Sequence, residues 1–142
     1  MRFACALLLS AAPLFAAAQP ASEPVSAAEA RAVRNVIEAQ LDAFQKDDAE
    51  RAFSYATPAI REQFGTPEHF IAMVRIEYAV VYRPRTVAFR APRRVGEELV
   101  QPVRMTDSEG HPWLVVYPME RQPDGNWRIN GCEIAKLPGQ ET

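Results

Sequence analysis

The hydrophobic positions of this chain change period near its middle. In the first half, apolar side chains recur at the spacing of one helix face, at Val33, Val36, Ile37, Leu41 and Phe44. This run follows Ser26-Ala27-Ala28-Glu29, in which the serine can cap the first turn while the glutamate bonds back to the serine amide. The pattern therefore predicts a long amphipathic helix that begins at Ser26.

Shorter helices are predicted after it. Asp47 or Asp48 can cap the first of them. Thr57-Pro58 and Thr66-Pro67 each place a capping hydroxyl before a proline, which is tolerated at the first helical position because its missing N–H has no partner there. The apolar side chains that these helices would bury are Ala52, Phe53, Ala56, Phe70, Met73 and Val74. Such closely spaced starts indicate short helices that turn sharply and wrap a surface.

In the second half the alternation has period two, which is typical of strands. The predicted strands cover residues 85–90, 99–107, 112–121 and 127–134. The third is apolar on both faces and is expected to be central, while Pro102 is expected to mark an edge or a bulge in the second. Helices followed by a strand meander predict an α+β fold, with N-terminal helices packed on a curved antiparallel sheet of about four strands. We expect one domain over residues 26–137 and a C-terminal tail over 138–142.

The N-terminus has the pattern of a targeting segment. Arg2 is followed by an apolar run from Phe3 to Ala12, and Ala16-Ala17-Ala18 fits the small-x-small cleavage rule. We expect a signal peptide over residues 1–18, cleaved near Ala18/Gln19, and a disordered leader over 19–25. The apolar run is short for a bilayer span, so no stable membrane span is expected after cleavage, although a retained anchor is the alternative. The expected location is the bacterial periplasm.

Charge is unevenly distributed along the remaining chain. Of 16 Lys and Arg residues only Arg2 would be lost with the segment, which leaves 15 against 18 acidic residues, or −3. Residues 83–104 nevertheless hold six arginines and two glutamates. The Arg83–Arg94 strip is interpreted as a solvated strand edge that resists aggregation, with an anionic partner as the alternative. Nucleic acid is not expected, because the net charge is negative and only Phe89 is interleaved for stacking.

Candidate chemistry is sparse. His69 falls in a first helical turn and His111 beside a turn, and neither has the spacing of a histidine–carboxylate pair. Asp107 precedes Ser-Glu-Gly, where aspartate usually caps a hairpin, with a catalytic acid as the alternative. Cys132 is the only cysteine outside the targeting segment and is expected to be a small buried hydrophobe, with pairing between two molecules left open. No metal and no cofactor are expected.

Several stretches together resemble a known family. They are Ile37–Phe44, Asp47-Asp48, Ala52–Pro58, Phe64–Pro67 and the ending Trp127-Arg128-Ile129. With them the chain resembles an uncharacterised family of short exported bacterial proteins. More broadly it is similar to the nuclear-transport-factor-2-like superfamily, which includes ketosteroid isomerases and SnoaL-type polyketide cyclases. The resemblance implies a conical pocket between the sheet and the helices.

Aromatic side chains are the candidates for lining such a pocket. The expected ligand-pocket residues are Tyr55, Tyr78, Trp113, Tyr117 and Trp127, with Phe64 as a further candidate. The favoured hypothesis is a non-catalytic module that binds a small hydrophobic ligand or a protein partner. One alternative is an isomerase-, dehydratase- or cyclase-like enzyme that uses a pocket tyrosine and a carboxylate. Another is a structural homodimer that pairs through the sheet. A carboxylate beside a tyrosine hydroxyl in a cavity would favour the enzyme.

Overall fold

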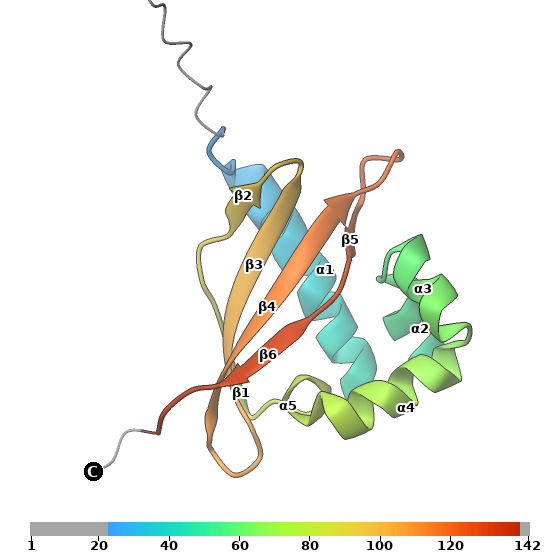
Figure 1. The fold of residues 1–142 in the computed structure, drawn as a ribbon, viewed down its shortest axis with the longest axis vertical. Helices are drawn as coiled ribbons and strands as arrows, with labels where there is room; N and C mark the ends of the chain where they lie inside the picture. Colours follow the sequence, from blue (N-terminus) through green and yellow to red (C-terminus); the bar gives the residue numbers. More distant parts are fainter. Residues whose placement is uncertain (1–22, 140–142) are drawn as a thin grey trace, which may run out of the picture.

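Five helices precede a curled antiparallel sheet in the computed structural model, which describes residues 23–139 (Figure 1). The helices are α1 (Ala27–Gln45), α2 (Ala49–Ser54), α3 (Pro58–Phe64), α4 (Pro67–Glu77) and α5 (Ala79–Tyr82). The strands are β1 (Thr86–Phe89), β2 (Arg93–Val95), β3 (Glu98–Thr106), β4 (Pro112–Arg121), β5 (Trp127–Ile129) and β6 (Glu133–Lys136). The predicted α+β class is confirmed. The expected signal peptide and most of the leader lie outside the described residues.

Local caps start the helices where the sequence indicates. Ser26 Oγ accepts a bond of 3.1 Å from the Glu29 amide, and Glu29 Oε2 accepts one of 3.0 Å from the Ser26 amide. The predicted capping box is therefore confirmed. Thr57 and Thr66 cap α3 and α4 as expected, each followed by proline. Of the two aspartates considered for α2, the cap is Asp48.

The sheet is four strands wide, although it contains six strands. Strand β4 is central, as predicted, with β3 on one side and β5 and β6 in succession on the other. In the same way β1 and β2 follow one another along the outer side of β3. The prediction of a single strand over residues 127–134 was wrong, because the chain leaves the ladder between Ile129 and Glu133. Strand β2 was not predicted.

Each break in an outer strand lies opposite a proline of the strand beside it. Pro102 of β3 faces the gap between β1 and β2, and Pro118 of β4 faces the gap between β5 and β6. Proline has no N–H to donate, so the outer strand loses a ladder bond at this position, while the β3–β4 ladder on the other side stays continuous. At the first gap the side-chain amide of the buried Gln101 replaces the missing backbone donor. It donates hydrogen bonds of 2.6 Å to Arg90 O and 2.8 Å to Pro102 O.

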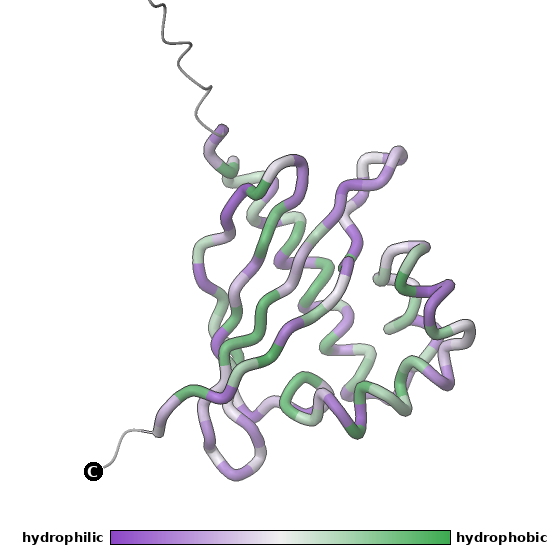
Figure 2. Tube along the Cα trace, in the orientation of Figure 1, coloured by the Kyte–Doolittle hydropathy of each residue, from purple (hydrophilic) through white to green (hydrophobic). Residues whose placement is uncertain are grey.

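The core lies between α1 and the inner face of the sheet. Figure 2 shows hydrophobic colour along the two long strands β3 and β4, and hydrophobic and hydrophilic stretches that alternate along α1. On β3 and β4 the buried positions alternate with partly exposed ones, as expected for a sheet covered on one face. The buried inner-face side chains of these strands are Leu99, Gln101, Val103, Met105, Val115, Tyr117 and Met119. Within residues 23–139 none of the helices combines the length and apolar character that a bilayer crossing requires.

Two charged clusters fasten the helices to the rest of the domain. Arg94 on β2 donates two bonds of 2.8 and 2.9 Å to Glu29 at the start of α1. At the other end of α1, Asp47 adopts a positive φ of 52° and accepts a hydrogen bond from the Tyr82 hydroxyl. Arg83 stacks on the Tyr82 ring with 4.0 Å to the centroid. The arginines at both ends of the Arg83–Arg94 strip therefore make structural contacts.

Candidate functional site: an uncharged pocket between helices and sheet

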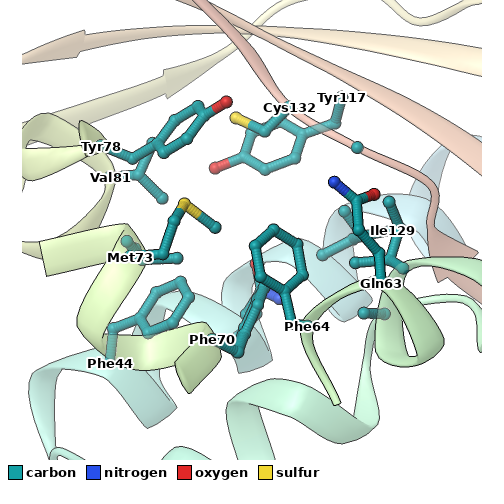
Figure 3. Close-up of a pocket in the computed structure, with 15 residues that line it drawn as sticks. Phe44, Gln63, Phe64, Phe70, Met73, Tyr78, Val81, Tyr117, Ile129 and Cys132 are labelled. Carbon is teal, nitrogen blue, oxygen red and sulfur yellow. The ribbon is translucent and has the colours of Figure 1, made fainter. Parts of the chain in front are cut away.

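A pocket of about 200 Å³ lies where the short helices meet the inner face of the sheet. Fifteen residues line it, from α1, α3, α4 and α5 on one side and from β4 and the β5–β6 segment on the other (Figure 3). They are Gln40, Phe44, Ala56, Ile60, Gln63, Phe64, Phe70, Met73, Val74, Tyr78, Val81, Tyr117, Ile129, Gly131 and Cys132. Apolar side chains dominate the wall, and every lining side chain is uncharged at neutral pH.

Phenylalanine side chains form the helical wall. Phe70 of α4 is the hub, with its ring centroid 6.0 Å from that of Phe44 and 5.7 Å from that of Phe64. Phe53 packs on the far side of Phe70 at 5.5 Å. The sharp turns between the short helices bring these rings together from four helices, α1 to α4. Met73, one turn along α4 from Phe70, extends its flexible side chain between Phe44 and Tyr78 (Figure 3).

The break between β5 and β6 forms the sheet side of the pocket. Ile129 ends β5, and Gly131 and Cys132 occupy the gap before β6. Gly131 has a φ of 139°, which side-chain-bearing residues rarely adopt, and the Pro118 ring lies beside it. Tyr117 lies on β4 next to this gap. Interruption of the ladder opposite Pro118 thus places a thiol and a phenol in the pocket wall.

The Tyr117 hydroxyl is the least satisfied polar group of the pocket. The residue is 1% exposed, and its hydroxyl oxygen has no hydrogen-bond partner within residues 23–139. Figure 3 shows the hydroxyl directed towards the side chains of Tyr78 and Met73. Burial raises the pKa of Tyr117 well above 10, with a smaller contribution from Cys132. The phenol is therefore a protonated hydrogen-bond donor in the wall of the cavity.

The other polar groups of the pocket are neutral as well. Burial raises the pKa of Tyr78, and it raises the pKa of the Cys132 thiol to about 12. Cys132 consequently stays a thiol near neutral pH and lacks the thiolate that nucleophilic chemistry needs. Gln40 is 3% exposed, and its side-chain amide donates a hydrogen bond of 3.1 Å to Ala52 O. Gln63 is exposed and lies at the rim of the pocket.

The pocket residues expected from sequence separate into two groups. Tyr78 and Tyr117 line the cavity, as does Phe64. Tyr55 lies outside the lining. Its hydroxyl accepts a hydrogen bond of 3.2 Å from Arg51 Nε, and its carbonyl oxygen accepts one of 2.8 Å from the Ile129 amide of β5. The two tryptophans also have other positions. Trp127 is buried in the core at 5% exposure.

Trp113 belongs to the hairpin between β3 and β4. Its Nε1 donates 2.9 Å to Asp107 Oδ2, while Asp107 Oδ1 accepts from the Glu109 and His111 amides. The Trp113 bond, with the two amide bonds, lowers the pKa of Asp107 to about 2. Asp107 therefore closes this turn, and its oxygens are committed away from the pocket. His111 is half exposed in the same turn.

Other groups add no competing site. His69 is exposed in the first turn of α4. A shallow second hollow of about 250 Å³ lies between α1 and β1, but its wall carries Arg34, Glu38 and Asp42 and lies on the charged side of α1. In the part of the chain that the structure describes, no group of three His, Cys, Asp or Glu side chains could hold a metal ion.

Sequence reasoning missed the residues that the sheet break brings into the pocket, Ile129, Gly131 and Cys132. A glycine inside a strand pattern often marks a bulge or a break, so Gly131 could have indicated it. Gln40 also lines the pocket, and its place among the buried positions of α1 is the signal that could have indicated it. No local pattern distinguishes Gln63 from an ordinary surface glutamine.

Comparison with known proteins gives a family without an assigned activity. The sequence profile of a family described as "Domain of unknown function (DUF4864)" matches residues 26–142. No curated protein matches the chain. Among solved structures, an NTF-2 like protein of unknown function from Burkholderia xenovorans LB400 is similar, with a TM-score of 0.47 and 14% sequence identity. That match covers 79% of this chain and 88% of the other.

Proposed function

The chain belongs to the DUF4864 family of unknown function, and on that premise we propose that it is an exported, non-catalytic module that binds a small, mainly apolar ligand. The ligand would occupy the pocket between the short helices and β4. The observation that carries this proposal is the composition of the wall, in which aromatic and aliphatic side chains surround a few neutral polar groups. Ligand sites generally have this composition, with the polar groups fixing orientation.

The enzyme alternative needs a carboxylate within reach of a pocket tyrosine. Tyr78 and Tyr117 supply phenols, but the fifteen lining residues include no aspartate, glutamate or histidine. Asp107, the carboxylate considered from sequence, is bonded within its own turn. General acid–base chemistry requires a proton acceptor positioned at the reacting group. The wall thus favours binding over proton transfer.

The size of the pocket limits the ligand. Its volume of about 200 Å³ is below the ~300–1,000 Å³ of sites for drug-sized molecules. An apolar cavity of about 150 Å³ accommodates benzene. The proposed ligand is therefore about the size of a singly substituted benzene or a short branched chain.

A pocket-filling variant tests the proposed function. We expect calorimetric titration with α-methylstyrene, a small apolar probe, to show saturable binding to the wild type. Met73→Trp should abolish binding because a larger ring occupies the space beside Phe44 and Tyr78. The matched control is Ile76→Trp on the same helix, whose side chain is 81% exposed, and which should bind the probe like the wild type. Absence of binding to a folded wild-type protein would contradict the proposal, and so would equal binding to Met73→Trp.

Export is a separate part of the proposal, and it rests on the N-terminal sequence pattern. Mass spectrometry of the protein purified from cells should give a mature N-terminus near Gln19. Recovery of the chain with Met1 intact in the cytoplasmic fraction would contradict it.

A second candidate function is self-association through the outer face of the sheet. The observation that favours self-association at this face is a row of partly exposed apolar residues on β3 and β4, which alternate with the core positions. They are Val100, Pro102, Leu114, Val116 and Pro118. A second copy could cover this row. Sedimentation velocity should then show a dimer that Val116→Lys converts to a monomer, with Val87→Lys on β1 as the control. A monomeric wild type at high concentration would exclude this candidate.

A further inference from the structure

The Tyr117 hydroxyl provides information about the ligand that the pocket volume does not. A buried hydroxyl without a hydrogen bond is costly, and most buried polar side-chain atoms in proteins have a partner. Tyr117 is 1% exposed, and its hydroxyl lies in the cavity wall beside Tyr78 and Met73, so a further partner can reach it only from the cavity side (Figure 3). No backbone or side-chain group of residues 23–139 fills that role.

We propose that the ligand is a neutral molecule that presents one hydrogen-bond-accepting oxygen, such as a carbonyl, to the Tyr117 hydroxyl. This inference rests on the proposed function of the pocket and specifies its ligand class. Tyr117 enters from the sheet side, whereas Phe44, Phe64 and Phe70 form the opposite wall. The ligand oxygen therefore lies against β4, and the apolar part of the ligand packs against the phenylalanine rings.

A donating phenol explains why the ligand group is an acceptor. The phenol proton stays on Tyr117 throughout the physiological range, because burial disfavours the phenolate. A protonated phenol offers one O–H donor, and a carbonyl oxygen with two lone pairs is a suitable partner. Tyr78 and the Cys132 thiol also remain protonated, so the polar groups around this end of the cavity can all donate.

The uncharged wall explains why the ligand is neutral. A carboxylate in the cavity would lose its hydration, and none of the fifteen lining residues is a lysine, arginine or histidine that could compensate its charge. Hydrogen bonds from phenol and thiol groups offset only part of that cost. A carboxylic acid that ionises at neutral pH is therefore excluded from the ligand class.

Three probes of nearly equal shape test the inference. Acetophenone carries a carbonyl oxygen, α-methylstyrene replaces that oxygen by CH₂, and benzoate replaces the acetyl group by a carboxylate. By calorimetric titration, acetophenone should bind about tenfold more tightly than α-methylstyrene, the range of one neutral hydrogen bond. Benzoate should bind at least about a hundredfold more weakly than acetophenone.

Tyr117→Phe is the decisive variant. It should remove the preference for acetophenone over α-methylstyrene while leaving binding of α-methylstyrene unchanged. Tyr55→Phe, which removes a hydroxyl that lies outside the pocket and accepts a bond from Arg51, should keep the preference. Infrared spectra provide a second readout, because the carbonyl stretch of bound acetophenone should lie at lower frequency in the wild type and in Tyr55→Phe than in Tyr117→Phe.

The outcomes separate this inference from the proposed function. If acetophenone and α-methylstyrene bind the wild type equally, or if Tyr117→Phe keeps the preference and the carbonyl shift, the ligand class is wrong although the pocket still binds. Tighter binding of benzoate would also overturn the neutral class. If no probe binds the folded protein, the proposed function itself fails.

Discussion

At the scale of single residues, Tyr117 combines a structural position with an unsatisfied group. Its ring belongs to the inner face of the central strand, while its hydroxyl makes no hydrogen bond within residues 23–139. Side chains that serve folding alone usually satisfy their buried polar atoms. A hydroxyl at this position is therefore better explained by binding than by stability.

Removal of the Tyr117 hydroxyl should not destabilise the ligand-free protein. Because Tyr117→Phe breaks no protein hydrogen bond, we expect the free energy of unfolding to stay unchanged or to rise by up to about 2 kcal/mol. Urea unfolding of the ligand-free protein measures it. Tyr82→Phe is the matched control and should lower the free energy of unfolding, since the Tyr82 hydroxyl bonds to Asp47. A loss of about 1 kcal/mol or more in Tyr117→Phe would show that its hydroxyl has a partner in the protein.

At the scale of elements, the N-terminus of α3 connects the helices to the sheet break. Thr57 is 1% exposed. Its Oγ1 donates a hydrogen bond of 2.9 Å to Asn130 Oδ1, and its amide donates one of 2.9 Å to the carbonyl oxygen of Ile129. Each threonine also accepts a capping hydrogen bond from the amide three residues later, Thr57 from Ile60 and Thr66 from His69. Thr66, however, is exposed and makes no such contact with the sheet. The same Thr-Pro motif therefore has two different roles.

We expect Thr57→Ala to lower the free energy of unfolding by about 2 kcal/mol and Thr66→Ala by about 0.5–1 kcal/mol. The difference reflects the buried bond to Asn130 that only Thr57 makes. Urea unfolding of both variants gives the comparison. Equal losses would mean that Thr57 acts only as a helix cap and does not hold α3 to the β5–β6 segment.

The contact between α1 and β2 should depend on pH. The Arg94 guanidinium, with the Ser26 amide, holds the pKa of Glu29 at about 2, below its ordinary value of 4.5. A lowered pKa in the folded state means that the ionised carboxylate stabilises the fold. That contribution is complete above about pH 4.5 and is lost as the pH falls towards 2.

Melting temperatures at a series of pH values test this contact. The difference in melting temperature between the wild type and Glu29→Gln should be largest at neutral pH and should shrink between pH 4.5 and 2. Glu38→Gln on the same helix is the control, because its exposed pair with Arg34 should contribute little at any pH. A constant difference for Glu29→Gln across this range would contradict the assignment.

At the scale of the whole molecule, the sequence predicted the features that depend on residues close together along the chain, namely the helix caps and the order of helices and strands. The caps at Ser26, Thr57 and Thr66 involve residues three positions apart, so the pattern alone locates them. The α+β class and the central place of β4 follow from hydrophobic periods. The prediction of four strands agrees with the width of the sheet, because each outer position is one interrupted strand.

The pocket was harder to predict, because contacts distant in sequence create it. The break after Ile129 depends on Pro118 of the neighbouring strand, and only that break brings Cys132 beside Tyr117. An aromatic side chain in a sequence does not reveal whether it lines a cavity, as Tyr117 does, or fills the core, as Trp127 does. Pairing across the sheet decides between them.

The central claim is that a small neutral ligand binds between the helices and β4, and methionine methyl NMR tests it most directly. Met73 lines the pocket, whereas Met105 and Met119 are fully buried elsewhere in the core. In protein labelled at the methionine methyl groups, titration with acetophenone should shift the Met73 signal saturably and leave Met105 and Met119 nearly unchanged. No shift of Met73 up to the solubility limit of acetophenone, or equal shifts of all three signals, would contradict the claim.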